Sequence, residues 1–360
     1  METFQAKCNV SITPDWKVNI MSDTQQELSG QDIEHEIVRR MPVGTRFSYG
    51  DRDYTVTDSG KPSSVSGEPK TDVYIAARSD DGHDLELKIS CKKDNADFLE
   101  NKVSADRARQ LFGDGYEDRL RSRCDALKSN LESRQKVFPI KSGRIDAGSI
   151  TLGWRLDLMN KQSGDLSMPL ATSFDDKMEV YSGALLPEDK RDAIVNGRRI
   201  SDSGVANQFY KSSSVPDTPQ GIVDSLQPME DYVRDDAPDI YMALKAVNYR
   251  LGKDKWDGNR PLVATCSWKM DADGMLRNSI DYSHPLAQGA NVPGEKVRTT
   301  LHDAGITSAD GLAEHVDSYS DTSVSGRHKR RSRSGMVWVD TYVRSDGATV
   351  HGHWRKNAKR

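Results

Sequence analysis

The sequence is poor in cysteine and aromatic residues and contains no long apolar run. Its four cysteines, Cys8, Cys91, Cys124 and Cys266, form no Cys-x-x-Cys pair and have no histidine at zinc-site spacing, which excludes a zinc finger. No stretch approaches the roughly 18 consecutive apolar residues of a membrane-spanning helix. The N-terminus lacks a basic segment followed by an apolar one, so no signal peptide is expected. These absences predict a protein of a reducing cytoplasm without a membrane partner.

Charge is distributed unevenly along the chain. The net charge is -4, yet residues 327–360 hold ten lysines and arginines against two aspartates, which leaves a net negative body. A polyanion should therefore be attracted to the tail rather than to the body. The tail either is a solvated aid to solubility or binds nucleic acid through Arg327, Lys329, Arg330, Arg331 and Arg333.

The first part of the chain shows helix-like and strand-like patterns in turn. Residues 30–41 carry apolar side chains at helical spacing, and strand-like runs follow over 45–50, 53–58, 71–77 and 84–91. Residues 95–131 are predicted to be helical. The mixture predicts an α/β (α+β) fold.

The rest of the chain divides less clearly. Residues 145–310 form an additional α/β region, with strands expected over 149–158 and 262–268 and helices over 187–197, 222–233 and 239–251. We therefore assign residues 1–317 to one main domain with its core near 30–130. Residues 318–335 are a basic, Ser-rich linker, and residues 336–360 are a small basic β unit, a hairpin that turns at Asp346-Gly347.

The segment from Pro69 to Lys92 has the pattern of two antiparallel strands joined by a turn at Asp80-Asp81-Gly82. Side chains of one parity on the second strand point to a single face, which carries Glu86, Lys88, Ser90 and Lys92. The opposite, buried face carries Leu85, Leu87, Ile89 and Cys91. Mg²⁺ prefers carboxylate oxygens, and a lysine among them can orient a water or stabilise charge on a phosphate. With Asp72 alongside, this face outlines a metal and phosphate site.

These residues carry a family resemblance. Pro69-x-x-Asp72, followed after thirteen residues by Glu86-Leu87-Lys88, resembles the PD-(D/E)XK nucleases, which include most type II restriction endonucleases. The longer form, GEPKTDV followed by ISCKKDNADFLENK, is similar to phage and prokaryotic restriction-like endonucleases in which PKTD precedes ISxKK. The resemblance covers about residues 60–110. It implies a mixed β-sheet core flanked by helices, bound Mg²⁺ for which Mn²⁺ can substitute, and hydrolysis of DNA phosphodiester bonds.

The resemblance leaves two registers open, and both use Asp72 to hold the metal. In the first, Glu86 and Lys88 are the catalytic pair, and Glu86 is the second metal ligand. In the second, Ser90 and Lys92 take those positions, so a carboxylate must come from elsewhere. We favour Lys92 because ISCKK carries the resemblance more fully.

Two further acids are expected at the metal. If Lys92 is catalytic, Asp106 on the following helix supplies the missing carboxylate, with Glu100 as the nearer competitor. The first helix is expected to contribute Glu36, because Glu36 lies nearer the apolar side of that helix than Glu34 does.

The expected function is a Mg²⁺-dependent endonuclease of the restriction or of the phage and mobile-element type, encoded by a prokaryote or a phage. Its partner is double-stranded DNA, whose phosphates are expected to contact Lys70, Lys93 and Arg107. A homodimer is left open. The alternative is a non-catalytic nucleic-acid-binding or phage structural protein whose nuclease-like hairpin is inactive.

Overall fold

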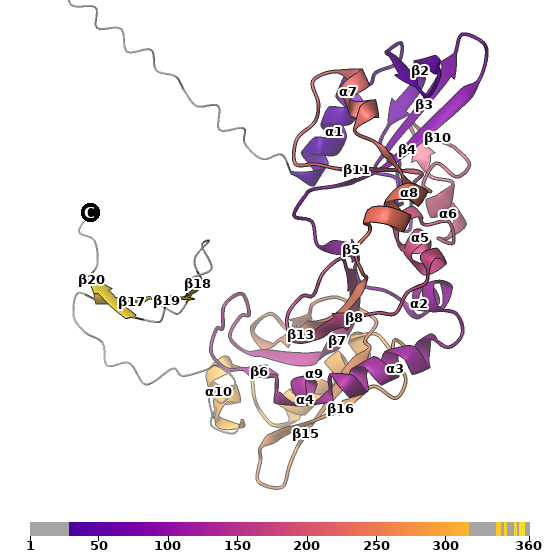
Figure 1. The fold of residues 1–360 in the computed structure, drawn as a ribbon. Helices are drawn as coiled ribbons and strands as arrows, with labels where there is room; N and C mark the ends of the chain where they lie inside the picture. Colours follow the sequence, from indigo (N-terminus) through magenta and orange to yellow (C-terminus); the bar gives the residue numbers. More distant parts are fainter. Residues whose placement is uncertain (1–28, 317–335, 340–341, 344–348, 351–352, 357–360) are drawn as a thin grey trace, which may run out of the picture. The chain divides into compact units, whose positions relative to one another are not determined.

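A computed structural model describes residues 29–316 and four short strands of the C-terminal segment (Figure 1). The fold is a mixture of helices and sheets, as the sequence predicted. Contacts divide the chain into two compact units that interleave along the sequence. The first unit ends at Tyr116 and resumes over Leu156–Leu244, and the second comprises Glu117–Arg155 and the chain from Lys245 onward. The sequence had instead suggested regions that follow one another end to end.

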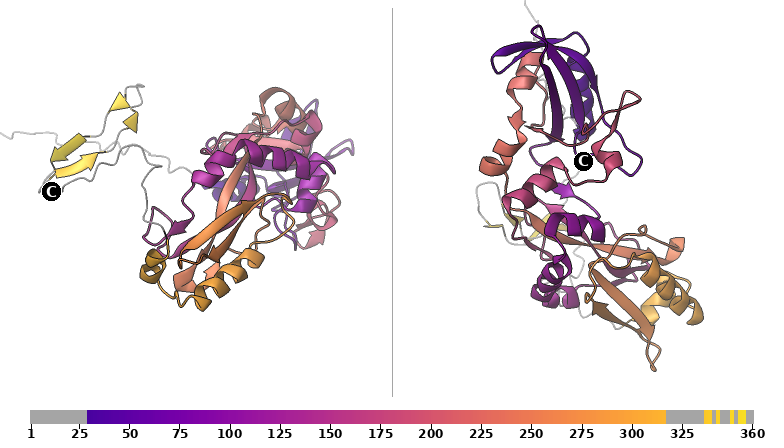
Figure 2. Two further views of the ribbon diagram at one scale, coloured as in Figure 1. Left: turned by 90° about the horizontal axis from the view of Figure 1, so that it is seen from below. Right: turned by 90° about the vertical axis from the view of Figure 1, so that its right-hand side faces the viewer.

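The first unit is built around a six-stranded mixed sheet of the order β1-β2-β3-β4-β11-β12, in which β4 and β11 are parallel. Figure 2 gives two further views of the ribbon. Its elements are α1 (Gly30–Arg40), β1 (Arg46–Tyr49), β2 (Arg52–Gly60), β3 (Val73–Ser79), β4 (Asp84–Lys92), β5 (Phe98–Glu100), α2 (Ala105–Phe112), β8 (Ser167–Pro169), α5 (Phe174–Ser182), α6 (Glu188–Arg191), β9 (Ile194–Val195), β10 (Arg198–Arg199), β11 (Gln208–Lys211), α7 (Pro219–Asp224), β12 (Gln227–Pro228) and α8 (Met229–Asp231).

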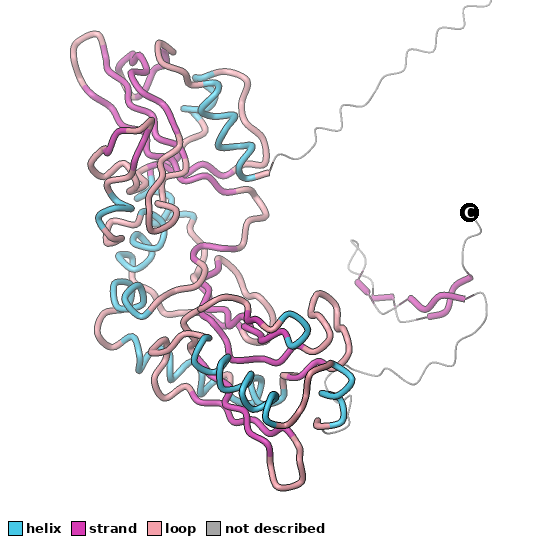
Figure 3. Tube along the Cα trace, turned by 180° about the vertical axis from the view of Figure 1, so that it is seen from behind, coloured by secondary structure: helices cyan, strands magenta, loops and turns pink. Residues whose placement is uncertain are grey.

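Helices cover both faces of this sheet, which Figure 3 shows in cyan and magenta. On one face, α1 and α7 pack on the inward side chains of β2, β3 and β4 in one apolar core. On the other face, an aromatic cluster joins α5, β11 and the turn after α8 through Tyr181, Phe209 and Tyr232. The expectation of a mixed sheet flanked by helices is confirmed.

Helix α1 begins and ends where its sequence predicts. Ser29 caps it and exchanges hydrogen bonds with Asp32 in a capping box, and Arg39 and Arg40 occupy the last turn, where they favour the negative end of the helix dipole. Ile33 and Ile37 are buried against the sheet. The helix prediction for residues 30–41 is therefore confirmed.

The second unit contains α3 (Tyr116–Ala126), α4 (Lys128–Ser133), β6 (Val137–Phe138), β14 (Lys255–Trp256), β15 (Ala264–Met270), β16 (Leu276–Asp281), α9 (Asn291–Asp303) and α10 (Ala309–Glu314). The long strands β7 (Ser149–Met159) and β13 (Tyr241–Arg250) complete a sheet of the order β14-β13-β7-β15-β16. Helix α9 packs on β15.

Four helix predictions were wrong in whole or in part. Residues 187–197 are helical only over Glu188–Arg191 and then form β9, and residues 222–233 contain the strand β12. Residues 95–104 are not helical: Phe98–Glu100 forms β5, which pairs with the end of β7, and α2 starts only at Ala105, behind its cap Ser104. The segment 239–251 is the strand β13 rather than a helix. Most of its side chains are buried on both faces, and such a run lacks the period that separates strand from helix.

The C-terminal unit is a set of paired strands. β17 (Met336–Val339) is antiparallel to β20 (His353–Lys356), and β18 (Tyr342–Val343) to β19 (Thr349–Val350), as expected for a hairpin. The expected turn at Asp346-Gly347 and the linker 318–335 lie outside the described residues.

Candidate active site

Strands β3 and β4 form the predicted hairpin. They are antiparallel neighbours with Val73 opposite Ile89 and Ala76 opposite Glu86. The turn is made by Asp80 to Gly82, and Gly82 has a φ of 90°, which favours glycine. The alternation on β4 is also as predicted, because the core contains Leu87, Ile89 and Cys91.

Asp72 lies immediately before β3 and is held against the end of β4. Its carboxylate accepts a hydrogen bond from the backbone N–H of Cys91 at 2.7 Å, and its own N–H donates to the carbonyl of Ile89 at 2.8 Å. The Ser90 hydroxyl lies 3.5 Å from the same carboxylate oxygen. The Asp72 carboxylate therefore lies next to the segment Ser90-Cys91-Lys92 at the end of β4.

The first register is less well placed. Glu86 lies opposite Ala76, four residues along the strand from Asp72, which is a separation of roughly 13 Å. Its carboxylate is engaged by the Tyr74 hydroxyl at 2.5 Å and lies 4.0 Å from the Lys88 ammonium. Glu86 and Asp72 are thus too far apart to ligate one metal ion, and the geometry favours the register of Ser90 and Lys92.

Asp72 has an unusual electrostatic environment. Burial raises the pKa of its carboxyl from the ordinary 3.8 to about 6, and the negative charge of Glu34 adds to the effect. Lys92, the Cys91 N–H and Lys61 act in the opposite direction. Burial likewise raises the pKa of the Cys91 thiol well above its usual value, so this cysteine is a poor nucleophile and a poor metal ligand.

The acid that α1 brings to Asp72 is Glu34, not Glu36. Glu36 is instead bound by Arg39 and Arg40 of its own helix, each at 2.5 Å. Glu34 acts on the charge of Asp72 and forms an ion pair with Lys61 at 2.5 Å. Glu34 and Glu36 both lie beside the buried side chains of Ile33 and Ile37. The sequence alone therefore cannot say which glutamate faces Asp72, and only the packing of α1 on the sheet decides it.

The expectation for Asp106 is not supported by its position. The Asp106 side chain is 91% exposed at the start of α2, and its contact is Arg109 of the same helix at 3.4 Å. The competitor Glu100 is buried instead, and its carboxylate forms ion pairs with Lys70 at 2.8 Å and with Arg107 at 2.6 Å. Burial opposes the ionisation of Glu100, but these two cations outweigh it and lower the pKa of its carboxyl to about 2.

Lys70 and Arg107 belong to a buried network rather than to a DNA-binding surface. Arg107 connects Glu100 to Glu179 of α5, which it contacts at 2.5 Å. The side chains of Arg107 and Glu179 are only 9% and 7% exposed. The burial and ion pairs of Lys70 and Arg107 do not favour the predicted role as phosphate contacts, because a buried, paired charge is poorly available to DNA in solution. The network is electrostatically coupled to the site through Lys70. Burial lowers the pKa of the Lys70 ammonium, and the positive charge of Lys92 lowers it further.

The cations left at the site are Lys92, Lys93 and a residue that the sequence did not indicate. Lys92 has no ion-pair partner within the described parts of the chain, and Lys93 is half-buried. Parallel pairing places the exposed Lys211 of β11 beside Lys92. More than a hundred residues separate these lysines, so no local pattern could have joined them. The predicted DNA-binding residues from Arg327 to Arg333 lie outside the described residues.

The fit to a divalent metal depends on two carboxylates. Within residues 29–316, no group of three or more histidine, cysteine, aspartate or glutamate side chains could hold a metal ion. Mg²⁺, however, keeps several waters and is commonly bound through one or two carboxylates and the phosphates of its substrate. Asp72 and Glu34 supply such a pair, and their mutual repulsion is relieved by a cation.

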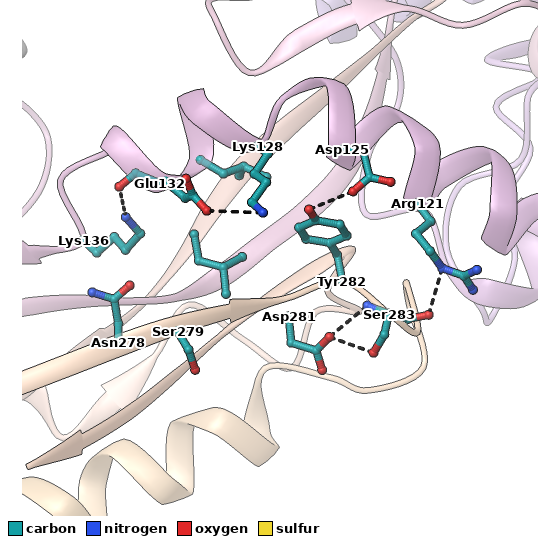
Figure 4. A pocket seen from close by; sticks show the side chains of 12 residues that line it. Arg121, Asp125, Lys128, Glu132, Lys136, Asn278, Ser279, Asp281, Tyr282 and Ser283 are labelled. Atoms are coloured by element: carbon teal, nitrogen blue, oxygen red, sulfur yellow. Dashed lines mark hydrogen bonds and ion pairs between the residues drawn. The ribbon is translucent and has the colours of Figure 1, made fainter.

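The second unit contains a separate pocket of about 650 Å³, shown in Figure 4. Helices α3 and α4 face β16 across it, and Tyr282 donates a hydrogen bond to Asp125 at 2.9 Å. Its cations are balanced by its acids, and Arg121 is held by Asp118 and by the carbonyl of Ser283. This balance does not favour a polyanion.

No family model, no curated protein and no solved structure matches the chain. Among the described helices, none has the length and apolar character needed to cross a membrane.

Proposed function

We propose that the chain is a Mg²⁺-dependent endonuclease that hydrolyses phosphodiester bonds of double-stranded DNA. The observation that carries the proposal is the hydrogen bond of 2.7 Å by which the Cys91 N–H fixes the Asp72 carboxylate beside Lys92. A half-buried acid next to a lysine, at the ends of two neighbouring strands, supports the resemblance to PD-(D/E)XK nucleases.

Each side chain has a separate task in this proposal. Asp72 and Glu34 would hold the metal, which when bound supplies Lewis-acid activation at a phosphate oxygen. Lys92 faces the same place, where its side chain would orient the attacking water or stabilise the charge that develops on the phosphate. Ser90 adds a hydroxyl that can donate to the Asp72 carboxylate or to a water.

Phosphate binding would come from the edge of the sheet where β4 and β11 end side by side. Lys92 and Lys211 are paired there, and Lys93 follows at once. A row of lysines at the active edge attracts DNA locally although the body of the protein is acidic. The basic segment 327–333 would add affinity without sequence preference.

The test is cleavage of supercoiled plasmid by the purified chain in Mg²⁺, with EDTA and the variant Asp72→Asn as controls. Nicking or linearisation that needs Mg²⁺ and Asp72 is the expected result. A protein that binds DNA but leaves the plasmid intact in both Mg²⁺ and Mn²⁺ contradicts the proposal. That outcome would support the rival function, a nucleic-acid-binding or phage structural protein with an inactive hairpin.

A further inference from the structure

Lys61 occupies a position that neither the sequence motif nor the proposed reaction assigns. It follows the last residue of β2, and β2 pairs with β3 so that Gly60 lies opposite Tyr74. The end of β2 therefore lies next to the start of β3, where Asp72 is. This adjacency brings a lysine from the loop after β2 to the Glu34 carboxylate and to the strand start beside Asp72.

The contacts of Lys61 are those of a counterion. Its ammonium pairs with Glu34 at 2.5 Å, and its charge also acts on Asp72. Among the described side chains, Glu34 has no other ion-pair partner within 4.0 Å. Lys61 therefore neutralises the acids that would repel each other in its absence.

Lys61 is more exposed to solvent than its partner Glu34. The Glu34 side chain is 12% exposed, whereas that of Lys61 is 38% exposed. The glutamate is fixed on a packed helix, while the lysine stem begins at a loop and has solvent on one side. Of the two, only the lysine can leave without disturbing the core.

We propose that Lys61 is a built-in counterion that competes with the divalent metal for Glu34 and is displaced when the metal binds. The inference rests on the proposed function, because it takes Asp72 and Glu34 as the metal ligands. Lys61 is then a positioning residue, which holds the Glu34 carboxylate in place until the metal binds. Its removal should tighten metal binding rather than weaken it.

The experiment is a titration of the full-length protein with Mn²⁺, in which free Mn²⁺ is followed by electron paramagnetic resonance without DNA. We expect Lys61→Met to tighten Mn²⁺ binding by about fivefold, the scale of one partly exposed ion pair. Lys61→Gln, which retains a hydrogen-bond donor, should change affinity in the same direction. Lys61→Arg, which keeps the charge, should bind Mn²⁺ as the parent does. The matched control is Lys161→Met, which removes an exposed lysine paired with Asp97 in the same unit and should leave affinity unchanged.

Asp72→Asn distinguishes a failure of the proposed metal site from a failure of the inference about Lys61. If Asp72→Asn weakens Mn²⁺ binding by about tenfold or more while Lys61→Met and Lys61→Gln leave it unchanged or weaken it, the inference about Lys61 is overturned and the metal site stands. If Asp72→Asn binds Mn²⁺ as the parent does, both the site and the inference are overturned. Thermal unfolding gives a second readout: Mn²⁺ should raise the Tm of Lys61→Met more than that of the parent.

Discussion

The backbone N–H of Cys91 donates a hydrogen bond to the Asp72 carboxylate over 2.7 Å. This bond fixes the end of β4 against the residue that precedes β3. The donor lies between Ser90 and Lys92 on β4, so this end of the strand is the part of the motif next to Asp72.

The first prediction concerns the two registers. Lys92→Ala and Asp72→Ala should each lower the rate of DNA cleavage by about 100-fold or more, because the proposed function places both side chains at the scissile phosphate. Lys88→Ala and Glu86→Ala should cost less than about tenfold, since Glu86 lies roughly 13 Å away along the strand. Single-turnover cleavage of a plasmid measures all four. Loss of activity only in the Glu86 and Lys88 variants would return the site to the other register.

The second prediction separates the two glutamates of α1. Glu34→Gln should abolish cleavage and weaken Mn²⁺ binding, because Glu34 shares the charge environment of Asp72. Glu36→Gln is the matched control on the same helix. It should keep activity because the Glu36 carboxylate forms ion pairs with Arg39 and Arg40 of the same helix. Helix content by circular dichroism should be the same in both. Normal cleavage by Glu34→Gln would remove this residue from the site.

The third prediction is a dependence of stability on pH. Burial raises the pKa of Asp72 in the folded protein from 3.8 to about 6, so the folded state retains a proton that the unfolded state has lost in this interval. The free energy of unfolding of the metal-free protein should therefore fall as pH rises from 3.8 through about 6, relative to Asp72→Asn. The difference should reach up to about 3 kcal/mol, at about 1.4 kcal/mol for each pKa unit.

Urea unfolding in EDTA at a series of pH values measures this difference. Asp106→Asn is the control, since it makes the same substitution at an exposed aspartate. Parallel profiles for the parent and Asp72→Asn would mean that Asp72 is not held in a desolvated position.

The fourth prediction concerns the buried network. Arg107→Leu removes one of the two cations of Glu100 and the ion-pair partner of Glu179, and the loss of one partner of a buried pair should lower the free energy of unfolding by about 3 kcal/mol. Arg109→Leu lies on the same helix, and its exposed pair with Asp106 should contribute less than about 1 kcal/mol. Chemical denaturation of the two variants compares them directly. Equal effects would show that the network adds no stability beyond that of a surface pair.

The fifth prediction concerns the basic segment. Replacement of Arg327, Lys329, Arg330, Arg331 and Arg333 by glutamine should weaken DNA binding. It should also lower the slope of log K against log salt by about 0.9 for each phosphate contact that is lost. Fluorescence anisotropy at several salt concentrations measures the slope. A slope equal to that of the parent would show that this segment does not contact DNA.

Local patterns were sufficient for much of the first unit. The apolar spacing of Ile33 and Ile37 predicted α1, and the alternation from Leu85 to Lys92 predicted both the strand β4 and its buried face. These features depend on side-chain periodicity and on caps such as Ser29, which act within a few residues. The position of Asp72 at the start of the neighbouring strand followed from the same reasoning.

The sequence by itself determined the hairpin, its turn and the polar row that ends at Lys92. The tertiary structure alone decided which acid joins Asp72, because Glu34 and Glu36 differ only in how α1 rotates onto the sheet. It also decided that Arg107 is buried in an ion network and that Lys211 stands beside Lys92, since both depend on segments distant in the chain. Periodicity specifies the faces of one element, whereas burial and charge pairing depend on which elements those faces meet.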